Sequence, residues 1–438
     1  MQISNNKSGI FRPLLVTLQT ILLIWVLAGC DYLNPPTPTV VQNTPTITPT
    51  HIRKPKPSTA TAAVFELRAT STALPSPTAF ELGVQPGSGY GPYGFPNNIN
   101  PLTGQPVDDP ALLERRPLVI KITNFPRSVR PQWGLSVADN VYEYYLEDGL
   151  TRFIGIFYGK DANRVGPVRS GRPFDEYIIR MYKGIFAFAY ADDRLIDFWE
   201  GSDINPFIVY ETPKNCPPMC RIGSKDSYNN LYTNTHELTL YGNTMNITQG
   251  RQNLNGLRFE EQTLAMNGGG LASRLETHFS LTSYNYWDYD PATLRYYRWQ
   301  EAERGDQSQL YEPLFDSLNS QQVYADNLVV LLVPVKYFFK SNSTEVYDFQ
   351  LSGRGKGYAL RQGKIFDIYW QRPNKDSLIS LTFPNGNYYP LKPGNTFFEV
   401  LGDQSIHQVL DQTWRFNFVI PEDLPAPTQT PKAKKTSP

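Results

Sequence analysis

The pattern of apolar and polar positions changes character about midway along the chain. In the first half, runs of apolar and β-branched residues predict strands at 116–124, 140–147 and 151–158. Apolar positions that recur every three or four residues predict helices at 173–182, 193–200 and about 227–240. The first half is therefore expected to mix strands with helices.

The strands at 140–147 and 151–158 are predicted to form a hairpin. They flank Asp148-Gly149, a dipeptide typical of tight turns between antiparallel strands. A two-residue loop would place Arg152 opposite Tyr145 and diagonal to Glu143 and Glu147, so that these charged side chains share one face of the hairpin.

From about residue 281 the pattern predicts strands only. Short β-prone runs flank turn dipeptides at 290–291, 362–363 and 385–386, and a long apolar run at 327–339 predicts a single buried strand. We expect an α+β protein, with a mixed α/β N-terminal module at 98–267 and a mainly antiparallel β module at 271–420. The boundary between them is the Gly-rich stretch 267–270.

The amino terminus has the features of a lipoprotein signal peptide, residues 1–29. Lys7 and Arg12 provide positive charge, 14–27 is apolar, and Leu27-Ala28-Gly29-Cys30 resembles a bacterial lipobox. The alternative, a transmembrane anchor, needs about 20 apolar residues, which this stretch lacks. We expect Cys30 to carry a diacylglycerol, with fatty acids such as palmitate, and to hold the protein on the extracytoplasmic face of the cell membrane.

The segments outside the folded part have a disordered composition. Residues 30–97 are rich in Pro and Thr and are predicted to form an extended tether, and 421–438 a disordered tail. The chain has 41 Lys and Arg against 41 Asp and Glu, a formal net charge of zero. This balance argues against nucleic acid as a partner.

Two cysteines remain after lipidation, Cys216 and Cys220, in a proline-rich loop. Outside the cytoplasm such a pair favours a disulfide. Free thiols, or a metal site completed by a residue such as His236, are the alternatives. We expect neither a metal nor a cofactor.

The densest polar segment is 164–173, which precedes a predicted helix. It contains Arg164, Arg169, Ser170 and Arg172, and arginine forks bind carboxylate or phosphate groups through two points. We expect an anion-binding site formed by these residues. Arg152 and Glu143 of the hairpin are expected to line it as well. The alternative is that the arginines pair internally with Glu143, Glu147 or Asp175.

No arrangement of residues typical of a catalytic site is visible. The chain has four His, no Gly-x-Ser-x-Gly turn and no helix with a zinc-protease His pair. We therefore predict no catalytic residues; the rival hypothesis is a glycan-acting enzyme that uses Glu143 or Glu147 as its acid/base.

Several stretches resemble the YerB-like family of bacterial lipoproteins, whose domain has no known function. They are 100–104 (NPLTG), 130–143, 149–153, 166–172 (GPVRSGR), 230–234, 353–357 and 391–394. The resemblance covers nearly all of the folded part. It implies a two-part module on a lipid anchor at the cell envelope and implies no reaction.

These observations lead to three hypotheses. The leading one is a non-catalytic envelope lipoprotein that binds an anionic cell-wall component or an envelope protein. The second is an envelope hydrolase or transferase that uses a glutamate as acid/base. The third is a structural assembly factor.

Overall fold

The computed structural model describes residues 89–223, 228–261, 269–302, 310–341 and 344–421. The expected signal peptide, Cys30, nearly all of the tether, and the C-terminal tail beyond residue 421 lie outside the described residues. All of the described residues fall in a single compact unit of the chain.

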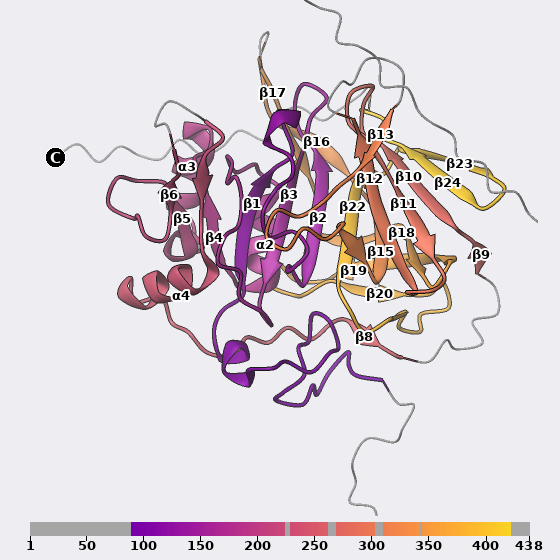
Figure 1. Ribbon diagram of the computed structural model, residues 1–438, viewed down its shortest axis with the longest axis horizontal. Helices are drawn as coiled ribbons and strands as arrows, with labels where there is room; N and C mark the ends of the chain where they lie inside the picture. Colours follow the sequence, from indigo (N-terminus) through magenta and orange to yellow (C-terminus); the bar gives the residue numbers. More distant parts are fainter. Residues whose placement is uncertain (1–88, 224–227, 262–268, 303–309, 342–343, 422–438) are drawn as a thin grey trace, which may run out of the picture. The chain divides into compact units, whose positions relative to one another are not determined.

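A large central sheet combines strands from both halves of the chain (Figure 1). Its strands, in spatial order, are β20 (Ser380–Thr382), β19 (Lys364–Arg372), β18 (Gly353–Arg361), β15 (Asn327–Val333), β22 (Thr396–Gly402), β2 (Asn140–Tyr145), β3 (Thr151–Phe157), β1 (Leu118–Thr123), β4 (Ile185–Phe188) and β5 (Ile208–Tyr210), with β9 (Gly270–Leu271) paired to β19. The halves join where β2 pairs in parallel with β22.

A second sheet comes from the C-terminal half alone. It contains β13 (Tyr311–Pro313), β12 (Arg295–Glu301), β11 (Tyr284–Asp290), β10 (Arg274–His278), β24 (Thr413–Asn417) and β23 (Ile406–Leu410), with β14 (Tyr324–Ala325) on β12. Three two-stranded pairs complete the strands: β16 (Val335–Lys340) with β17 (Glu345–Phe349), β21 (Pro390–Leu391) with β8 (Arg258–Phe259), and β6 (Cys220–Arg221) with β7 (Leu231–Tyr232).

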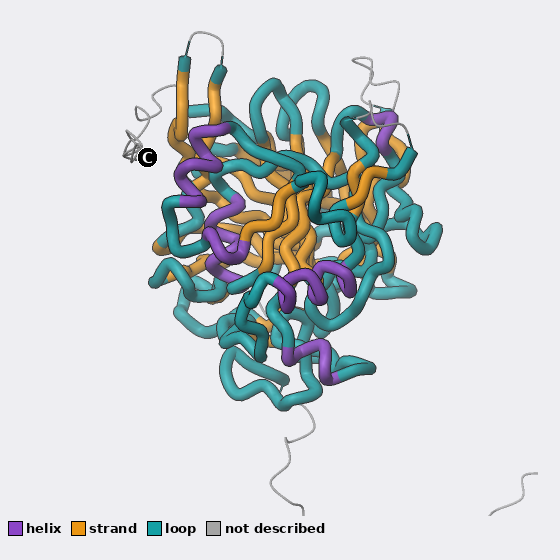
Figure 2. The backbone as a smooth tube through the Cα atoms, turned by 90° about the vertical axis from the view of Figure 1, so that its left-hand side faces the viewer, coloured by secondary structure: helices purple, strands orange, loops and turns teal. Residues whose placement is uncertain are grey.

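The helices all lie in the N-terminal half among the described residues. They are α2 (Asp175–Tyr182), α3 (Asp193–Glu200) and α4 (Thr235–Thr244), with short 3₁₀ turns η1 (Pro110–Glu114), η2 (Arg127–Val129) and η3 (Asn205–Phe207). Figure 2 looks onto these helices, with the strands behind them. The expected α+β class is confirmed. The module boundaries stay a prediction, and the structure adds that strands of both predicted modules share one sheet.

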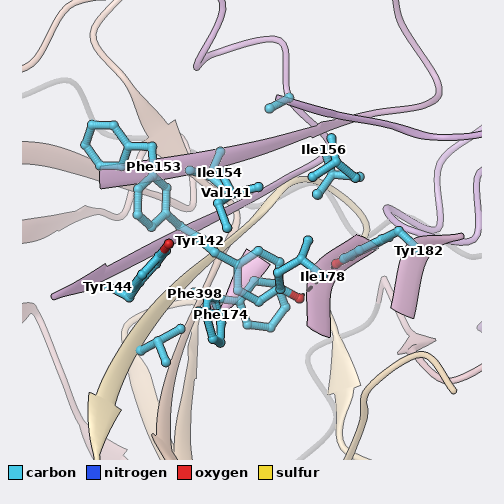
Figure 3. Packing of buried hydrophobic residues seen from close by; sticks show 14 of the residues in the cluster. Val141, Tyr142, Tyr144, Phe153, Ile154, Ile156, Phe174, Ile178, Tyr182 and Phe398 are labelled. Atoms are coloured by element: carbon cyan, nitrogen blue, oxygen red, sulfur yellow. Dashed lines mark hydrogen bonds between the residues drawn. The ribbon is translucent and has the colours of Figure 1, made fainter. Parts of the chain in front are cut away.

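The two faces of β2 and β22 pack against different partners, because successive side chains on a strand point to opposite sides. On one face Tyr142 stacks on Phe398 with ring centroids 4.3 Å apart, and Phe174 packs against Tyr142 just before α2 (Figure 3). On the other face, Phe397 contacts Trp287 of the second sheet, with ring centroids 4.7 Å apart.

The register of the β2–β3 hairpin differs by one residue from the expected one. Tyr145 pairs with Thr151 and Tyr144 with Arg152, while Asp148 and Gly149 both adopt positive φ in the turn. The loop is therefore longer than two residues, although the turn dipeptide was correctly identified. A slip of one residue moves a side chain to the opposite face of the sheet, so Arg152 shares a face with Tyr144 and not with Glu143.

Two other elements differ from the prediction. The apolar run 327–339 is split at Pro334, which lacks the N–H that a continuous strand needs, into β15 and β16. Helix α4 begins at Thr235 and not at 227, because the Asn234 side chain accepts the N–H groups of His236 and Glu237 as an N-cap. In contrast, α3 has the predicted bounds 193–200.

Candidate anion-binding site

Backbone hydrogen bonds hold the 164–173 segment against the end of β1. The Arg169 N–H donates to the Lys121 carbonyl, and the Thr123 N–H donates to the Pro167 carbonyl. On its other side, the Ala189 N–H that follows β4 donates to the Arg169 carbonyl. The segment is thus fixed on both sides, and its side chains have defined positions.

Arg152, Arg169 and Arg172, with Ser170, form a group that we call the arginine corner. Arg152 reaches it from β3, where its Nη1 donates to the Ser170 carbonyl at 2.6 Å. Burial and the positive charges of Arg172 and Arg169 together lower the pKa of Arg152 to about 9, although Glu147 opposes the shift. The corner therefore concentrates positive charge.

Arg172 is held by an internal ion pair, as the structural alternative anticipated. Its Nε donates to Glu147 Oε2 at 3.0 Å, and its Nη2 contacts Glu147 Oε1. Burial alone would raise the pKa of Glu147, but the bonds from Arg172 hold it below its usual range. Glu147 is thus a fixed carboxylate that orients Arg172.

Arg169 is the least satisfied member of the corner. Its Nη1 donates to the Tyr228 carbonyl at 3.3 Å, and its Nε is buried without a hydrogen-bond partner among the described residues. Burial lowers its pKa, and so do the charges of Arg172 and Arg221. An arginine whose charge no carboxylate balances in the described structure is suited to bind an anion.

A buried ion pair lies beneath the corner. Lys121 Nζ is 2.8 Å from Asp175 Oδ1, and both side chains are 0% exposed. The Tyr144 hydroxyl donates to the same oxygen at 2.7 Å, and the Arg172 N–H donates to Asp175 Oδ2 at 2.8 Å. Burial lowers the pKa of Lys121 to about 7, although Asp175 opposes the shift. This pair ties β1 to α2 and so supports the corner.

The charges of this region do not balance. Lys121, Arg152, Arg169 and Arg172 are four cationic side chains, and Glu147 and Asp175 are the two carboxylates that pair with them, so the difference is two. Within the described ranges, Arg152 and Arg169 are the guanidinium groups of the corner that form no ion pair with a carboxylate.

Arg164 lies apart from these partners. Its guanidinium carbon is 4.5 Å from the Trp133 ring centroid and 5.6 Å from that of Tyr232. This cation–π arrangement gives it a packing role between two aromatic rings, and it shares no hydrogen-bond partner with the corner among the described residues.

Glu143 lies on the opposite face of the sheet from the corner, contrary to its expected place in the site. The register explains this, since Glu143 pairs with Phe153, whose side chain points to the face opposite that of Arg152. Its side chain is buried, with Oε2 2.7 Å from Arg298 Nη2 and Oε1 accepting the Thr151 hydroxyl at 2.7 Å. Glu143 therefore joins the two sheets.

The sequence reasoning missed the rest of this buried cluster. Glu399 lies directly opposite Glu143 across the β2–β22 pair, and Arg298 of the second sheet reaches both carboxylates. Burial and, next, the charge of Glu143 together raise the pKa of Glu399 to about 8. The buried cluster could have been predicted from a single charged residue within an apolar strand, as in Phe397-Phe398-Glu399-Val400. Lys121 in the apolar strand β1 follows the same pattern.

Cys216 and Cys220 are joined by a disulfide in the structure, with Cα atoms 4.8 Å apart. Within the described ranges no group of three or more His, Cys, Asp or Glu side chains is placed to hold a metal ion. None of the helices in those ranges combines the length and apolar character needed to cross a membrane.

Comparisons with known proteins agree with this architecture. The family model described as "Protein of unknown function (DUF3048) N-terminal domain" matches residues 102–248, and that of the DUF3048 C-terminal domain matches 275–398. The chain belongs to this family. The first matched region contains the hairpin with the arginine segment, and the second contains strands β11 to β14 of the second sheet.

A relative from Bacillus subtilis (strain 168) is named "Putative lipoprotein YerB". It is 22% identical over 312 residues, which cover 69% of this chain and 86% of that protein. The crystal structure of Bacillus subtilis YerB is similar, with a TM-score of 0.57 at 22% identity, over 69% of this chain and 96% of that chain. This likeness supports the fold, and the relative's name supports an envelope lipoprotein of unknown function. The family resemblance noted from the sequence is confirmed.

Proposed function

We propose that this protein is a non-catalytic envelope lipoprotein whose arginine corner binds an anionic cell-wall component. The observation that carries the proposal is the excess of two cationic side chains at the corner, with Arg169 lacking any carboxylate partner among the described residues. An acidic polymer or an acidic surface of an envelope protein supplies the missing charge. The expected lipid on Cys30 would keep the corner at the membrane.

The hydrolase alternative has less support from the geometry. A general acid must contact its substrate, and Glu143 is 1% exposed and bonded to Arg298. Glu147 has a lowered pKa because of Arg172, whereas a general acid of this kind needs a raised one.

The test is binding of the purified full chain in detergent to isolated wall sacculi, across a salt series. The decisive variant is Arg169→Gln, which removes the unbalanced charge but no ion pair of the described structure. Its matched control is Arg354→Gln, an exposed arginine on β18 that stacks on Tyr369 at 3.8 Å. Far-UV circular dichroism establishes that both variants fold.

We expect binding to weaken as salt increases, and Arg169→Gln to bind at least tenfold more weakly, since a charge-assisted hydrogen bond contributes about 1.5–3 kcal/mol. Arg354→Gln should bind like the wild type. Salt-independent binding, or equal binding by both variants, would refute the role of the corner. Release of soluble wall fragments in the same tube would instead support the enzyme alternative.

A further inference from the structure

A polar hollow of about 380 Å³ lies away from the arginine corner, at one end of the central sheet. Its wall includes Asp139, Asp326 and Asn395, each of which immediately precedes a strand: β2, β15 and β22. These strands run parallel, so their amino ends meet at the same edge. The 100–108 loop, residues 136–138 and 159–160, and Arg295 and Tyr324 of the second sheet form the rest of the wall. The volume falls within the range of small-molecule sites, about 300–1,000 Å³.

One wall of the hollow presents an arginine fork. The Arg295 guanidinium lies 4.1 Å from the Tyr324 ring centroid, and its Nε donates to Asp326 at 3.4 Å. These contacts fix its plane, while Nη1 and Nη2 have no hydrogen-bond partner among the described residues. Two parallel N–H donors of this kind match the two oxygens of a carboxylate.

A second cation lines the same hollow. Lys160 follows the end of β3, is exposed, and forms no ion pair with the described residues. The adjacent turn is fixed, because Asp139 Oδ2 accepts the N–H groups of Tyr158 at 2.6 Å and Gly159 at 3.0 Å. Lys160 therefore projects from an ordered position.

The carboxylates of the hollow are not equivalent. The Asp139 carboxylate already accepts the N–H groups of Tyr158 and Gly159 and the Asn100 amide, the last at 2.8 Å. The Asp326 carboxylate forms an ion pair with Lys392 at 2.6 Å. Asp108 is exposed and has no ion pair in the described structure. The groups left for a ligand are thus two cations and one carboxylate.

We propose that this hollow binds a small zwitterion, a free amino acid or a short peptide. The ligand carboxylate would lie at Arg295 and Lys160, and its ammonium group at Asp108. A ligand with both charges matches the two cations and the single carboxylate, whereas a phosphate dianion would be repelled by Asp108.

The test measures calorimetric binding of five probes to the purified full chain in detergent. The probes are alanyl-alanine in its L,L and D,D forms, its C-terminal amide, its N-acetyl derivative, and inorganic phosphate. The variants are Arg295→Gln, Lys160→Gln and Asp108→Asn. Arg354→Gln is the matched control, because it removes an arginine stacked on a tyrosine outside the hollow. Thermal unfolding checks that each variant is folded.

We expect either form of the dipeptide to bind, the C-terminal amide to bind at least tenfold more weakly, and the N-acetyl derivative several-fold more weakly. Arg295→Gln, Lys160→Gln and Asp108→Asn should each weaken the dipeptide, and Arg354→Gln should not. Equal binding of the amide, tighter binding of phosphate, or no binding of either dipeptide would overturn the proposal. If Arg295→Gln fails to fold, dipeptide binding by the Lys160→Gln and Asp108→Asn variants, both at exposed positions, decides the result.

Discussion

Replacing Glu399 by Gln should make the protein more stable, by an amount that grows with pH. Glu399 and Glu143 face one another across β2 and β22 and share the single cation Arg298, at 3.4 and 2.7 Å respectively. Burial, and next the charge of Glu143, raise the pKa of Glu399 to about 8, because the single cation Arg298 does not offset both; Glu399 therefore keeps its proton in the folded protein below that pH. In the unfolded chain the same carboxyl has a pKa of about 4.3.

The sign and size of the effect follow from this difference. Between pH 4.3 and 8 the folded protein holds a proton that the unfolded chain releases, so each added pH unit lowers the free energy of unfolding by about 1.4 kcal/mol. Glutamine cannot ionise and so removes this loss. Its amide keeps the oxygen that accepts the Trp287 indole N–H at 2.8 Å.

The assay is urea denaturation of the full chain, followed by tryptophan fluorescence, at pH 5, 6 and 7. The difference between the variant and the wild type should increase by about 3 kcal/mol from pH 5 to pH 7. Other titrating groups with shifted pKa values, such as Lys121, contribute equally to both proteins and cancel in this difference. The control Glu114→Gln, at an exposed position, should show no such trend. A difference that stays constant with pH, or that decreases, would refute the shared-cation reasoning.

The other predictions concern the buried ion pair and the cysteines. Lys121→Met should lower the free energy of unfolding by about 3–5 kcal/mol, because it leaves Asp175 buried without a cation, and Lys121→Met/Asp175→Asn should recover most of the loss in the same urea assay. Intact-mass spectrometry with alkylation should add no groups to Cys216 and Cys220 before reduction and two after it; alkylation without reduction would contradict the disulfide. Cys30→Ala should abolish acyl labelling and move the protein out of the membrane fraction, and unchanged fractionation with retained label would contradict the lipid anchor.

Local sequence signals were sufficient for the elements that depend on neighbouring residues. Helix α3 has its predicted bounds because Asp192 caps it and its apolar residues repeat at helical spacing. The β18–β19 hairpin forms around Gln362 and Gly363, both with positive φ, as the dipeptide indicated. The arginine segment was also recognised from sequence, since three arginines lie within nine residues.

The grouping of the candidate site depended on tertiary structure. A one-residue difference in the β2–β3 register placed Glu143 on the opposite face from Arg152, and turn residues alone do not determine that register. The Lys121–Asp175 pair and the Glu143–Arg298–Glu399 cluster join residues 54 to 256 positions apart, and the hollow at Arg295 collects separate segments from both halves.

By itself, the sequence determined the expected compartment, the local elements and the presence of a concentrated set of arginines, because these depend on composition and short spacing. Only the tertiary structure decided which charges are neutralised and which remain free for a ligand. The reason is that a charge is balanced by whatever the fold brings within a few ångströms of it. In this protein the deciding pairing, β2 with β22, joins strands that lie far apart in the chain.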